Sequence, residues 1–329
     1  MLERAVLIPL DLAPAVPPPG SRIHAFGGAS MGTAWSARVA AGAISDPRPA
    51  LQAELDAVVA QMSHWDRDSL LSRYNRAPAG TWVDLPPEFC AVMDYALWAQ
   101  DASGGAYDPA AGALVNLWGF GPARRYDHAG FYAPDADAIA RVPRVRVELD
   151  RAGRRLLQPG GAVLDLSSIA KGFAVDRLAL CLERRGLHHY VVEVGGELRG
   201  AGVKPDGHPW WVEIEGVPDA DAAQAVVALH GLSVATSGDY RQYFTQDERR
   251  VAHTLDPRTG RPIANDVASV TVLASTCMAA DALSTVLTVL GPVDGLAFAE
   301  RRALAARFLV RRAGALEEIR STAWTALLQ

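Results

Sequence analysis

The sequence is short of cysteine and of excess basic charge. Only three of its 329 residues are cysteine. Cys90, Cys181 and Cys277 lie far apart in apolar contexts without a Cys-x-x-Cys spacing, which argues against a disulfide framework and against a zinc site. Lys and Arg number 32 against 37 Asp and Glu, a net charge of −5. The chain therefore offers no basic field for nucleic acid or for an anionic membrane.

Long apolar runs are also scarce. The N-terminal run from Ala5 to Ile8 is broken by Pro9 and Asp11, which makes it too short for a secretory signal. No cysteine follows it to carry a lipid anchor, and no other stretch reads as long enough to span a bilayer. We therefore expect a cytoplasmic protein without membrane insertion. A leader missing from this sequence would instead indicate the periplasm.

What is present indicates a globular α+β protein. Hydrophobic residues make up 50% and charged residues 21% of the chain, which is ordinary for a folded domain. The Pro-rich segment from Pro14 to Gly20 predicts a flexible leader over residues 1–22, followed by a single domain over residues 23–329.

Hydrophobic periodicity predicts both helices and strands. Helices are expected over residues 49–62, 87–102, 168–185 and 278–290, and strands over residues 144–149, 162–166, 190–194, 210–214, 269–273 and 306–310. The order shows no regular βα repeat, so mixed sheets with packed helices are expected. Residues 121–142 lack periodicity and suggest a flap or a short helical excursion.

The segment from His253 to Gly260 (His-Thr-Leu-Asp-Pro-Arg-Thr-Gly) combines a histidine with a tight turn. Pro257 restrains the backbone of Asp256, and Gly260 can take the positive φ of a sharp reversal. His253 on such an anchored segment could exchange a proton near neutral pH. An ordinary turn beside a surface histidine is the alternative.

Two helix starts carry groups suited to a phosphate or a metal. The block from Asp165 to Asp176 joins an expected strand to a helix whose first turn holds Lys171, so an anion could bind there; a serine N-cap beside a solvated lysine is the alternative. Asp281 and Thr285 share one face of the last expected helix and are oxygen donors for a hard divalent cation. The alternative is that Asp281 is an acidic residue in the first turn of the helix and that the Thr285 hydroxyl bonds a backbone carbonyl of the preceding turn.

Taken in order, these segments resemble the ApbE family of FAD:protein FMN transferases. The matching segments are Met31 to Thr33, Met62 to Trp65, Ser72 to Asn75, Ala106 to Pro109, Leu117 to Phe120, Asp165 to Asp176, Gly195-Gly196, Thr236 to Tyr240, His253 to Gly260, and Asp281 to Thr285. They cover nearly the whole chain after the leader, and their shared order makes the resemblance specific.

The resemblance implies an α+β fold with FAD in a cleft between two subdomains. It also implies a Mg²⁺-dependent enzyme that transfers FMN from FAD through its phosphate to a Thr or Ser of an acceptor flavoprotein and releases AMP. Asp281 and Thr285 match metal-binding positions, with Ser168 and the less certain Ser284 beside them. His253 is the candidate base. The positions expected to contact FAD are Met31, Trp65, Ala106, Tyr107, Asp108, Asp165, Lys171 and Leu255.

The acceptor is expected to be a separate protein. The acceptor motif that the resemblance implies, Asp-x-x-Ser/Thr-Gly-Ala-Ser/Thr, has its nearest match at Asp101 to Ala106, which lacks the final hydroxyl. Two alternatives stay open: a Mg²⁺-dependent FAD pyrophosphatase, with water in place of the acceptor, and a flavin-binding protein without chemistry. Retention of Asp281, Thr285 and His253 argues against the second.

Overall fold

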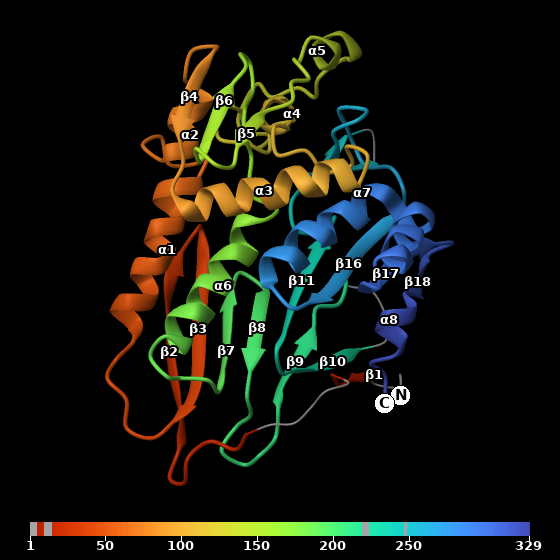
Figure 1. Cartoon of the computed structure of the whole chain (residues 1–329). Coiled ribbons are helices and arrows are strands. Elements are labelled where there is room, and N and C mark those ends of the chain that lie inside the picture. The colour runs from red at the N-terminus through yellow and green to blue at the C-terminus, as the bar shows by residue number, and fades with distance from the viewer. Residues whose placement is uncertain (1–4, 10–14, 219–223, 247–248) are drawn as a thin grey trace. The chain divides into compact units, whose positions relative to one another are not determined.

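The computed structural model describes residues 5–9, 15–218, 224–246 and 249–329. The chain divides into two compact units, each assembled from separate segments. Unit 1 comprises Met1–Ala57, Lys171–Gly238 and Asp266–Gln329, and unit 2 comprises Val58–Ala170 and Asp239–Asn265. Figure 1 traces the chain through its helices and strands.

Unit 1 is built on an eight-stranded sheet in which every neighbouring pair is antiparallel (Figure 1). Across the sheet the strands are β2 (Arg22–Ser30), β3 (Thr33–Ala41), β7 (Tyr190–Val194), β8 (Glu197–Ala201), β11 (Leu232–Gly238), β16 (Val267–Ala274), β17 (Ala305–Arg312) and β18 (Ala315–Arg320). β16 is buried along nearly its whole length, as expected of a central strand rich in β-branched residues.

A three-stranded sheet of unit 1 pairs β1 (Ala5–Leu7) in parallel with β10 (Ala225–Leu229), which pairs with antiparallel β9 (Trp210–Ile214). Leu7 is fully buried in a core that includes Trp324. Part of the expected flexible leader is therefore a paired strand, whereas residues 1–4 and 10–14 of that leader lie outside the described residues.

Two long helices carry the site residues of unit 1: α6 (Ala170–Glu183), which starts at the unit boundary, and α7 (Cys277–Arg301). α7 packs along β11 and β16. Its helical backbone is interrupted at Gly291, where φ is 79° and ψ is 179°, and resumes at Pro292. α1 (Arg48–Met62) runs from unit 1 into unit 2, and α8 (Thr322–Thr325) lies near the C-terminus.

The expectation that no apolar stretch is long enough to span a membrane is wrong for α7. By length and composition alone, this helix is long and apolar enough to cross a membrane. However, 61% of its most apolar stretch is buried inside the fold. A helix at the core of a folded domain meets the same criterion, so α7 is weak evidence for a membrane span.

Unit 2 combines short helices with small sheets. The helices are α2 (Leu70–Asn75), α3 (Pro87–Ala102), α4 (Gly112–Leu117) and α5 (Ala136–Ala140). β4 (Thr81–Asp84), β6 (Arg155–Gln158) and β5 (Glu148–Asp150) form one sheet, β12 (Tyr243–Gln246) pairs with β13 (Arg249–Ala252), and β14 (Leu255–Asp256) pairs with β15 (Arg261–Pro262). Leu114, Trp118, Phe120, Ile139 and Leu255 form a hydrophobic core.

The strand expected over residues 162–166 is wrong. Within it only Val163 forms a bridge, to Ala111. Side-chain amides satisfy alternate residues, because Gln158 bonds both backbone groups of Ala162 and Asn75 bonds both backbone groups of Leu164. Val163 and Asp165 instead bond to the backbone of Gly112 and Pro109. The backbone is thereby satisfied without a ladder.

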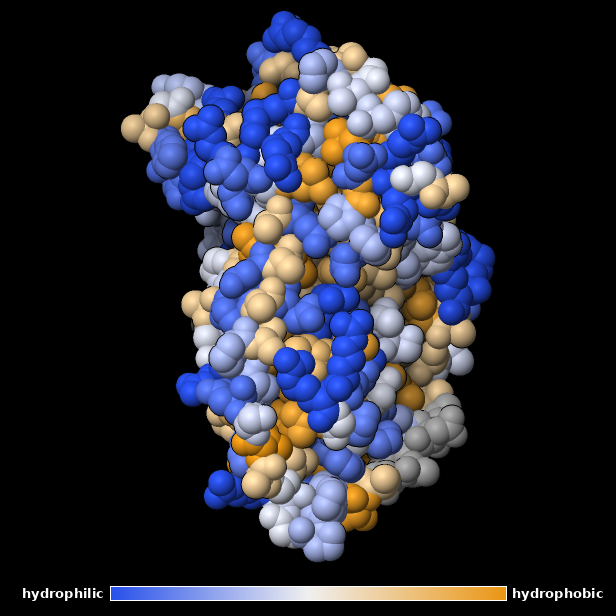
Figure 2. Space-filling view, turned by 60° about the vertical axis from the view of Figure 1, so that its left-hand side comes forward, coloured by the Kyte–Doolittle hydropathy of each residue, from blue (hydrophilic) through white to orange (hydrophobic). Residues whose placement is uncertain are grey.

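Large exposed apolar side chains in the described part of the chain are Val16, Ile23, Trp65, Trp82, Trp98, Tyr132, Trp211, Tyr243 and Val293. On the face drawn in Figure 2, hydrophobic residues lie in small groups among hydrophilic ones. Single exposed apolar side chains of this kind are common on folded proteins.

Candidate active site

The segment from His253 to Gly260 forms the tight turn that its sequence predicts. Gly260 has a φ of 73°, and its amide donates to the carbonyl oxygen of Asp256 over 2.8 Å. The indole N–H of Trp118 donates to the Gly260 carbonyl over 2.8 Å, and Arg144 donates to the Pro257 carbonyl over 2.6 Å. The turn is thus fixed to the rest of unit 2. Leu255, in β14, is buried at 7% exposure, which leaves its backbone as the part suited to contact a ligand.

The ring of His253 is oriented by a backbone carbonyl. Its Nδ1 lies 3.0 Å from the carbonyl oxygen of Gln242, and because a carbonyl only accepts, Nδ1 carries the proton. A neutral ring then has its lone pair on Nε2, the tautomer that a general base needs. The ring also packs edge-on against Phe120, with centroids 6.2 Å apart.

The loop after α3 holds three of the expected flavin contacts. Ala106 and Tyr107 are buried at 1% and 3% exposure. Asp108 accepts hydrogen bonds from the side chain of Gln100 and the amide of Ala110, both over 2.9 Å. Burial raises the pKa of Asp108, and the Ala110 hydrogen bond and the charge of Arg144 only partly oppose it. The phenol oxygen of Tyr107 accepts a 3.1 Å hydrogen bond from Ser168.

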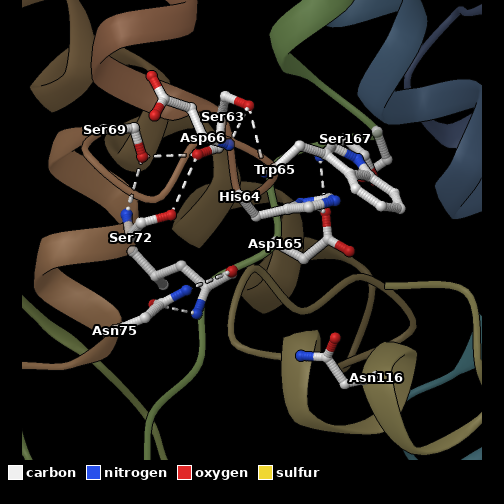
Figure 3. A network of polar contacts seen from close by, with 12 residues as sticks. Ser63, His64, Trp65, Asp66, Ser69, Ser72, Asn75, Asn116, Asp165 and Ser167 are labelled. Carbon is white, nitrogen blue, oxygen red and sulfur yellow. Dashed lines mark hydrogen bonds and ion pairs between the residues drawn. The ribbon is translucent and has the colours of Figure 1, made fainter. Parts of the chain in front are cut away.

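A histidine that was not predicted as a site residue pairs with Asp165. The Nδ1 atom of His64 lies 3.1 Å from Oδ1 of Asp165, and the two side chains are 10% and 8% exposed. The same oxygen accepts a 2.8 Å hydrogen bond from the amide of Ser167. Figure 3 shows the pair with Trp65 beside it. His64 lies in the segment from Met62 to Trp65 that contributed to the resemblance, but a lone histidine gave no signal of its buried partner.

Serine and asparagine side chains fix the segments on both sides of this pair. The hydroxyl of Ser63 accepts from the amides of Trp65 and Asp66, each over 3.2 Å (Figure 3). Asn75 donates to the carbonyl of Leu164 over 3.0 Å and accepts from its amide over 2.7 Å. The loop that carries His64 and the backbone next to Asp165 are therefore both anchored by side-chain hydrogen bonds.

Each side chain of the pair favours the charged form of the other. Burial disfavours the charged form of His64, but the Asp165 carboxylate outweighs that effect and raises the pKa of His64. Burial also opposes ionisation of Asp165, yet the charge of His64 and hydrogen bonds from His64 and Ser167 lower its pKa to about 2. Asp165 is therefore an ionised carboxylate that only accepts hydrogen bonds.

We expect this pair to stabilise unit 2 in a pH-dependent way. Asp165, with its lowered pKa, stabilises the fold above about pH 4 and loses that contribution toward pH 2. His64, with its raised pKa, contributes its charge below 6.5 and loses that contribution as the pH rises through its folded-state pKa. The Tm difference between the wild type and His64→Gln should be largest near about pH 5 to 6 and shrink as the pH rises through the folded-state pKa of His64. A constant difference in thermal melts would contradict this assignment.

Met31 and Trp65 have the conformation and the exposure expected of ligand contacts. Met31 sits in the β2–β3 turn of unit 1 at a φ of 53°, next to Gly32 at 73°. A non-glycine residue in this region is uncommon and marks a functional candidate. The indole of Trp65 in unit 2 is 51% exposed, and the Arg125 guanidinium lies 5.6 Å from its ring centroid.

Lys171 lies in the first turn of α6, as predicted, and forms an ion pair. Its Nζ donates to Oε1 of Glu197 over 2.5 Å, and Glu197 is buried at 2% exposure. The buried carboxylate neutralises much of the lysine charge. Attraction of a phosphate to Lys171 alone is therefore weaker than the sequence suggests.

The candidate metal donors of unit 1 lie on α7, which Asp281 ties to α6. Asp281 is buried at 4% exposure and accepts a 2.9 Å hydrogen bond from the amide of Gly172. The hydroxyl of Ser284 donates to the carbonyl of Asp281 over 2.8 Å. Ser237 on β11 lies 2.7 Å from the Ser284 hydroxyl and 3.2 Å from that of Thr285.

These donors fit magnesium better than a soft metal. They are one carboxylate and neutral hydroxyl oxygens, which Mg²⁺ accepts when water and substrate phosphate complete its shell. In the described part of the chain, no group of three or more His, Cys, Asp and Glu side chains could hold a metal. A site of this type would therefore depend on oxygen atoms of the nucleotide.

Close packing of α6 on α7 yields a stability prediction. A Cβ atom at Gly172 would lie 2.3 Å from the carbonyl oxygen of Cys277 and 2.7 Å from Cβ of Asp281. Gly172→Ala should therefore separate the helices and lower the free energy of unfolding by about 1–3 kcal/mol. Gly42→Ala is the control, because a Cβ there meets nothing within 4 Å. Equal denaturant midpoints for the two variants would contradict the predicted clash.

The site residues divide between the units. Met31, Lys171, Asp281, Ser284 and Thr285 lie in unit 1, and Trp65, Ala106, Tyr107, Asp108, Asp165, Ser168, His253 and Leu255 lie in unit 2. Unit 1 thus carries the Asp281 carboxylate and two hydroxyls, whereas unit 2 carries the His253 imidazole, the exposed indole, the Ser168 hydroxyl and the His64–Asp165 pair. Their joint action in one cleft remains a prediction of the resemblance.

Known proteins resemble this chain over almost its whole length. The ApbE family model matches residues 31–308. A FAD:protein FMN transferase of Haemophilus influenzae is 35% identical over 94% of this chain and 93% of its own, and one of Vibrio cholerae is 37% identical over 94% of both. The crystal structure of the Pseudomonas stutzeri flavinyl transferase ApbE, apo form, is similar with a TM-score of 0.84 at 36% identity, covering 97% of this chain and 98% of that one.

The family match includes all of unit 2, most of unit 1 and every candidate site residue from Met31 to Thr285. The α+β architecture expected from the sequence is confirmed by its likeness to solved flavin transferases. The chain belongs to the ApbE family.

Proposed function

We propose that this protein is an FAD:protein FMN transferase. The observation that carries the proposal is its likeness, across more than nine tenths of the chain, to proteins bearing that name. In the proposed reaction, the hydroxyl oxygen of an acceptor Thr or Ser attacks the FMN phosphorus. The P–O bond to the AMP half of FAD breaks, and AMP leaves with the bridging oxygen. The hydroxyl proton passes to a base.

His253 is the proposed base. Its Nδ1–H is held by the Gln242 carbonyl, and the rigid turn from Asp256 to Gly260 follows directly. The resulting tautomer presents Nε2 as the proton acceptor. A neutral imidazole can take up the hydroxyl proton while the P–O bond forms.

Asp281 and Thr285 are the proposed metal ligands, with Ser168 and Ser284 as further oxygen donors. A bound Mg²⁺ would neutralise charge on the pyrophosphate oxygens. The amide of Gly172 fixes the Asp281 carboxylate, and the neighbouring helix turn orders the hydroxyls. The fixed positions avoid reorganisation of these side chains when the nucleotide binds.

Flavin contacts are proposed for Met31, Trp65, Ala106, Tyr107, Asp108, Asp165, Lys171 and Leu255. The exposed indole of Trp65 offers a stacking face. Asp108 and Asp165 are suited to hydroxyl or ring N–H donors, and Lys171 acts beside Glu197 as part of an ion pair. The acceptor is proposed to be a separate flavoprotein.

AMP release tests the proposal. FAD and Mg²⁺ are incubated with the protein, with and without an acceptor carrying a Thr or Ser in the motif that the resemblance implies. The proposal predicts AMP formation that depends on the acceptor and ceases when the metal is chelated. AMP formation without acceptor would identify a pyrophosphatase, and FAD binding without any AMP would identify a binding protein.

A further inference from the structure

His64 lies between Asp165 and Trp65 in unit 2. Its Nδ1 donates to Oδ1 of Asp165 over 3.1 Å, and its ring centroid is 5.2 Å from that of Trp65 at an interplanar angle of 45°. The histidine thus contacts both a buried carboxylate and a half-exposed indole. These two residues are flavin contacts in the proposed function, whereas His64 has no role there.

Packing alone does not explain a histidine at this position. Its Nε2 atom is buried and has no hydrogen-bond partner among the described residues. Leaving a buried polar atom unsatisfied is unfavourable, and an apolar side chain of similar size would avoid that penalty. The bond to Asp165 is therefore the interaction that accounts for the imidazole.

Two hydrogen bonds fix one oxygen of the Asp165 carboxylate, Oδ1. Oδ1 accepts from His64 and from the amide of Ser167. The backbone amide of Asp165 donates to the carbonyl of Pro109 over 2.9 Å, and the adjacent Leu164 is held by Asn75. Figure 3 shows the second carboxylate oxygen turned away from His64. That oxygen, Oδ2, is the one through which a ligand would be recognised.

The charge of the pair limits the class of group recognised. With Asp165 ionised, the pair carries no net positive charge whether the imidazole is neutral or protonated, so it offers little attraction to a phosphate. An ionised carboxylate accepts hydrogen bonds and donates none. The complementary ligand atom is therefore a hydroxyl or ring N–H donor.

We propose that His64 is a positioning residue for the flavin nucleotide: it holds Oδ1 of Asp165 so that Oδ2 accepts a hydrogen bond from a hydroxyl or ring N–H of FAD beside the indole of Trp65. The proposal rests on the proposed function, since it takes FAD as the ligand. It adds a residue that acts through Asp165 and touches no reacting atom.

Replacement of His64 should weaken FAD binding more than it slows turnover. His64→Leu should raise both the Kd and the KM for FAD by about ten- to a hundredfold, the range expected for loss of a hydrogen bond to a charged group. kcat at saturating FAD should change by less than about threefold, because the lost interaction binds FAD equally in the ground state and in the transition state. His64→Gln, which keeps a donor for Asp165, should recover most of the affinity. His188→Leu, at an exposed histidine, is the control and should bind FAD as the wild type does.

A double-mutant cycle separates positioning from general destabilisation. Asp165→Asn should also weaken FAD binding, and His64→Leu combined with Asp165→Asn should bind no more weakly than the worse single variant. Tryptophan fluorescence of the full-length protein titrated with FAD measures each Kd, and circular dichroism checks folding. If His64→Leu is poorly folded, His64→Ala, which also removes the donor to Asp165, takes its place in the cycle.

Three results would overturn the proposal: unchanged FAD affinity in folded His64→Leu, a fall in kcat with KM unchanged, or additive losses in the double variant. These results are distinct from failure of the proposed function. If the wild type binds FAD but forms neither AMP nor an FMN adduct, the transferase assignment fails while the binding cycle still tests His64.

Discussion

Asp281→Ala should lower Mg²⁺-dependent FMN transfer by on the order of a hundredfold or more, because metal stabilisation of phosphoryl charge is worth several kcal/mol. Asp281 supplies the only carboxylate among the four proposed ligands, the others being the hydroxyl residues Ser168, Ser284 and Thr285. Initial rates of AMP release across a Mg²⁺ titration measure the effect. The residual rate of the variant should no longer depend on the metal.

Asp281→Asn separates the metal role from the structural one. An amide oxygen still accepts from the Gly172 amide, which preserves the contact between α6 and α7, but the charge is lost. The Asn variant should fold like the wild type and lose Mg²⁺-dependent turnover as the Ala variant does. Undiminished turnover in both variants would refute Asp281 as a metal ligand.

His253→Ala should lower FMN transfer by about a hundred- to ten-thousandfold, the usual contribution of a general base. Its FAD affinity should stay within about threefold of the wild type, since the base acts on the acceptor hydroxyl and not on the flavin. Single-turnover formation of the FMN adduct and equilibrium FAD titration measure the two quantities separately.

His253→Gln is the matched variant, because its amide N–H can donate to the Gln242 carbonyl but it cannot accept a proton. It should be as slow as His253→Ala if proton transfer is the role. Recovery of activity in His253→Gln would instead show that His253 stabilises the turn, and full activity in His253→Ala would remove it from the mechanism.

Local sequence signals predicted much of the fold. Strands β7 and β9 and helix α3 lie over the expected residues, because each has a clear hydrophobic period and nearby turn residues. α7 also breaks where expected, at Gly291. Its continuation from Pro292 was not expected, although proline at the first position of a helical segment is a favoured arrangement.

Weak local signals explain the elements that were missed. β2 and β3 were not predicted, and β2 is an edge strand with largely exposed residues and two glycines, Gly27 and Gly28. Its conformation depends on pairing with β3, which no local period reveals. For residues 162–166 the error is the reverse, since a strand is predicted from the sequence and none is found. There the side chains of Gln158 and Asn75 bond backbone groups that a neighbouring strand would otherwise bond.

The candidate site was predictable where chemistry is local and not where it depends on distant partners. The turn after His253 follows from Pro257 and Gly260, and Asp281 and Thr285 share a helix as their spacing predicts. The pairing of Lys171 with Glu197 and of His64 with Asp165 joins residues far apart in the chain. Such pairs cannot be predicted from one sequence, because nothing local to either residue identifies its partner.

The most direct test is intact-protein and peptide mass spectrometry of an acceptor protein after incubation with this protein, FAD and Mg²⁺. We predict one added FMN per acceptor on a Thr or Ser of the implied motif, formed in step with AMP and absent when Asp281→Ala replaces the wild type. AMP formation with an unmodified acceptor, in the presence of active enzyme and metal, would contradict transfer and identify hydrolysis.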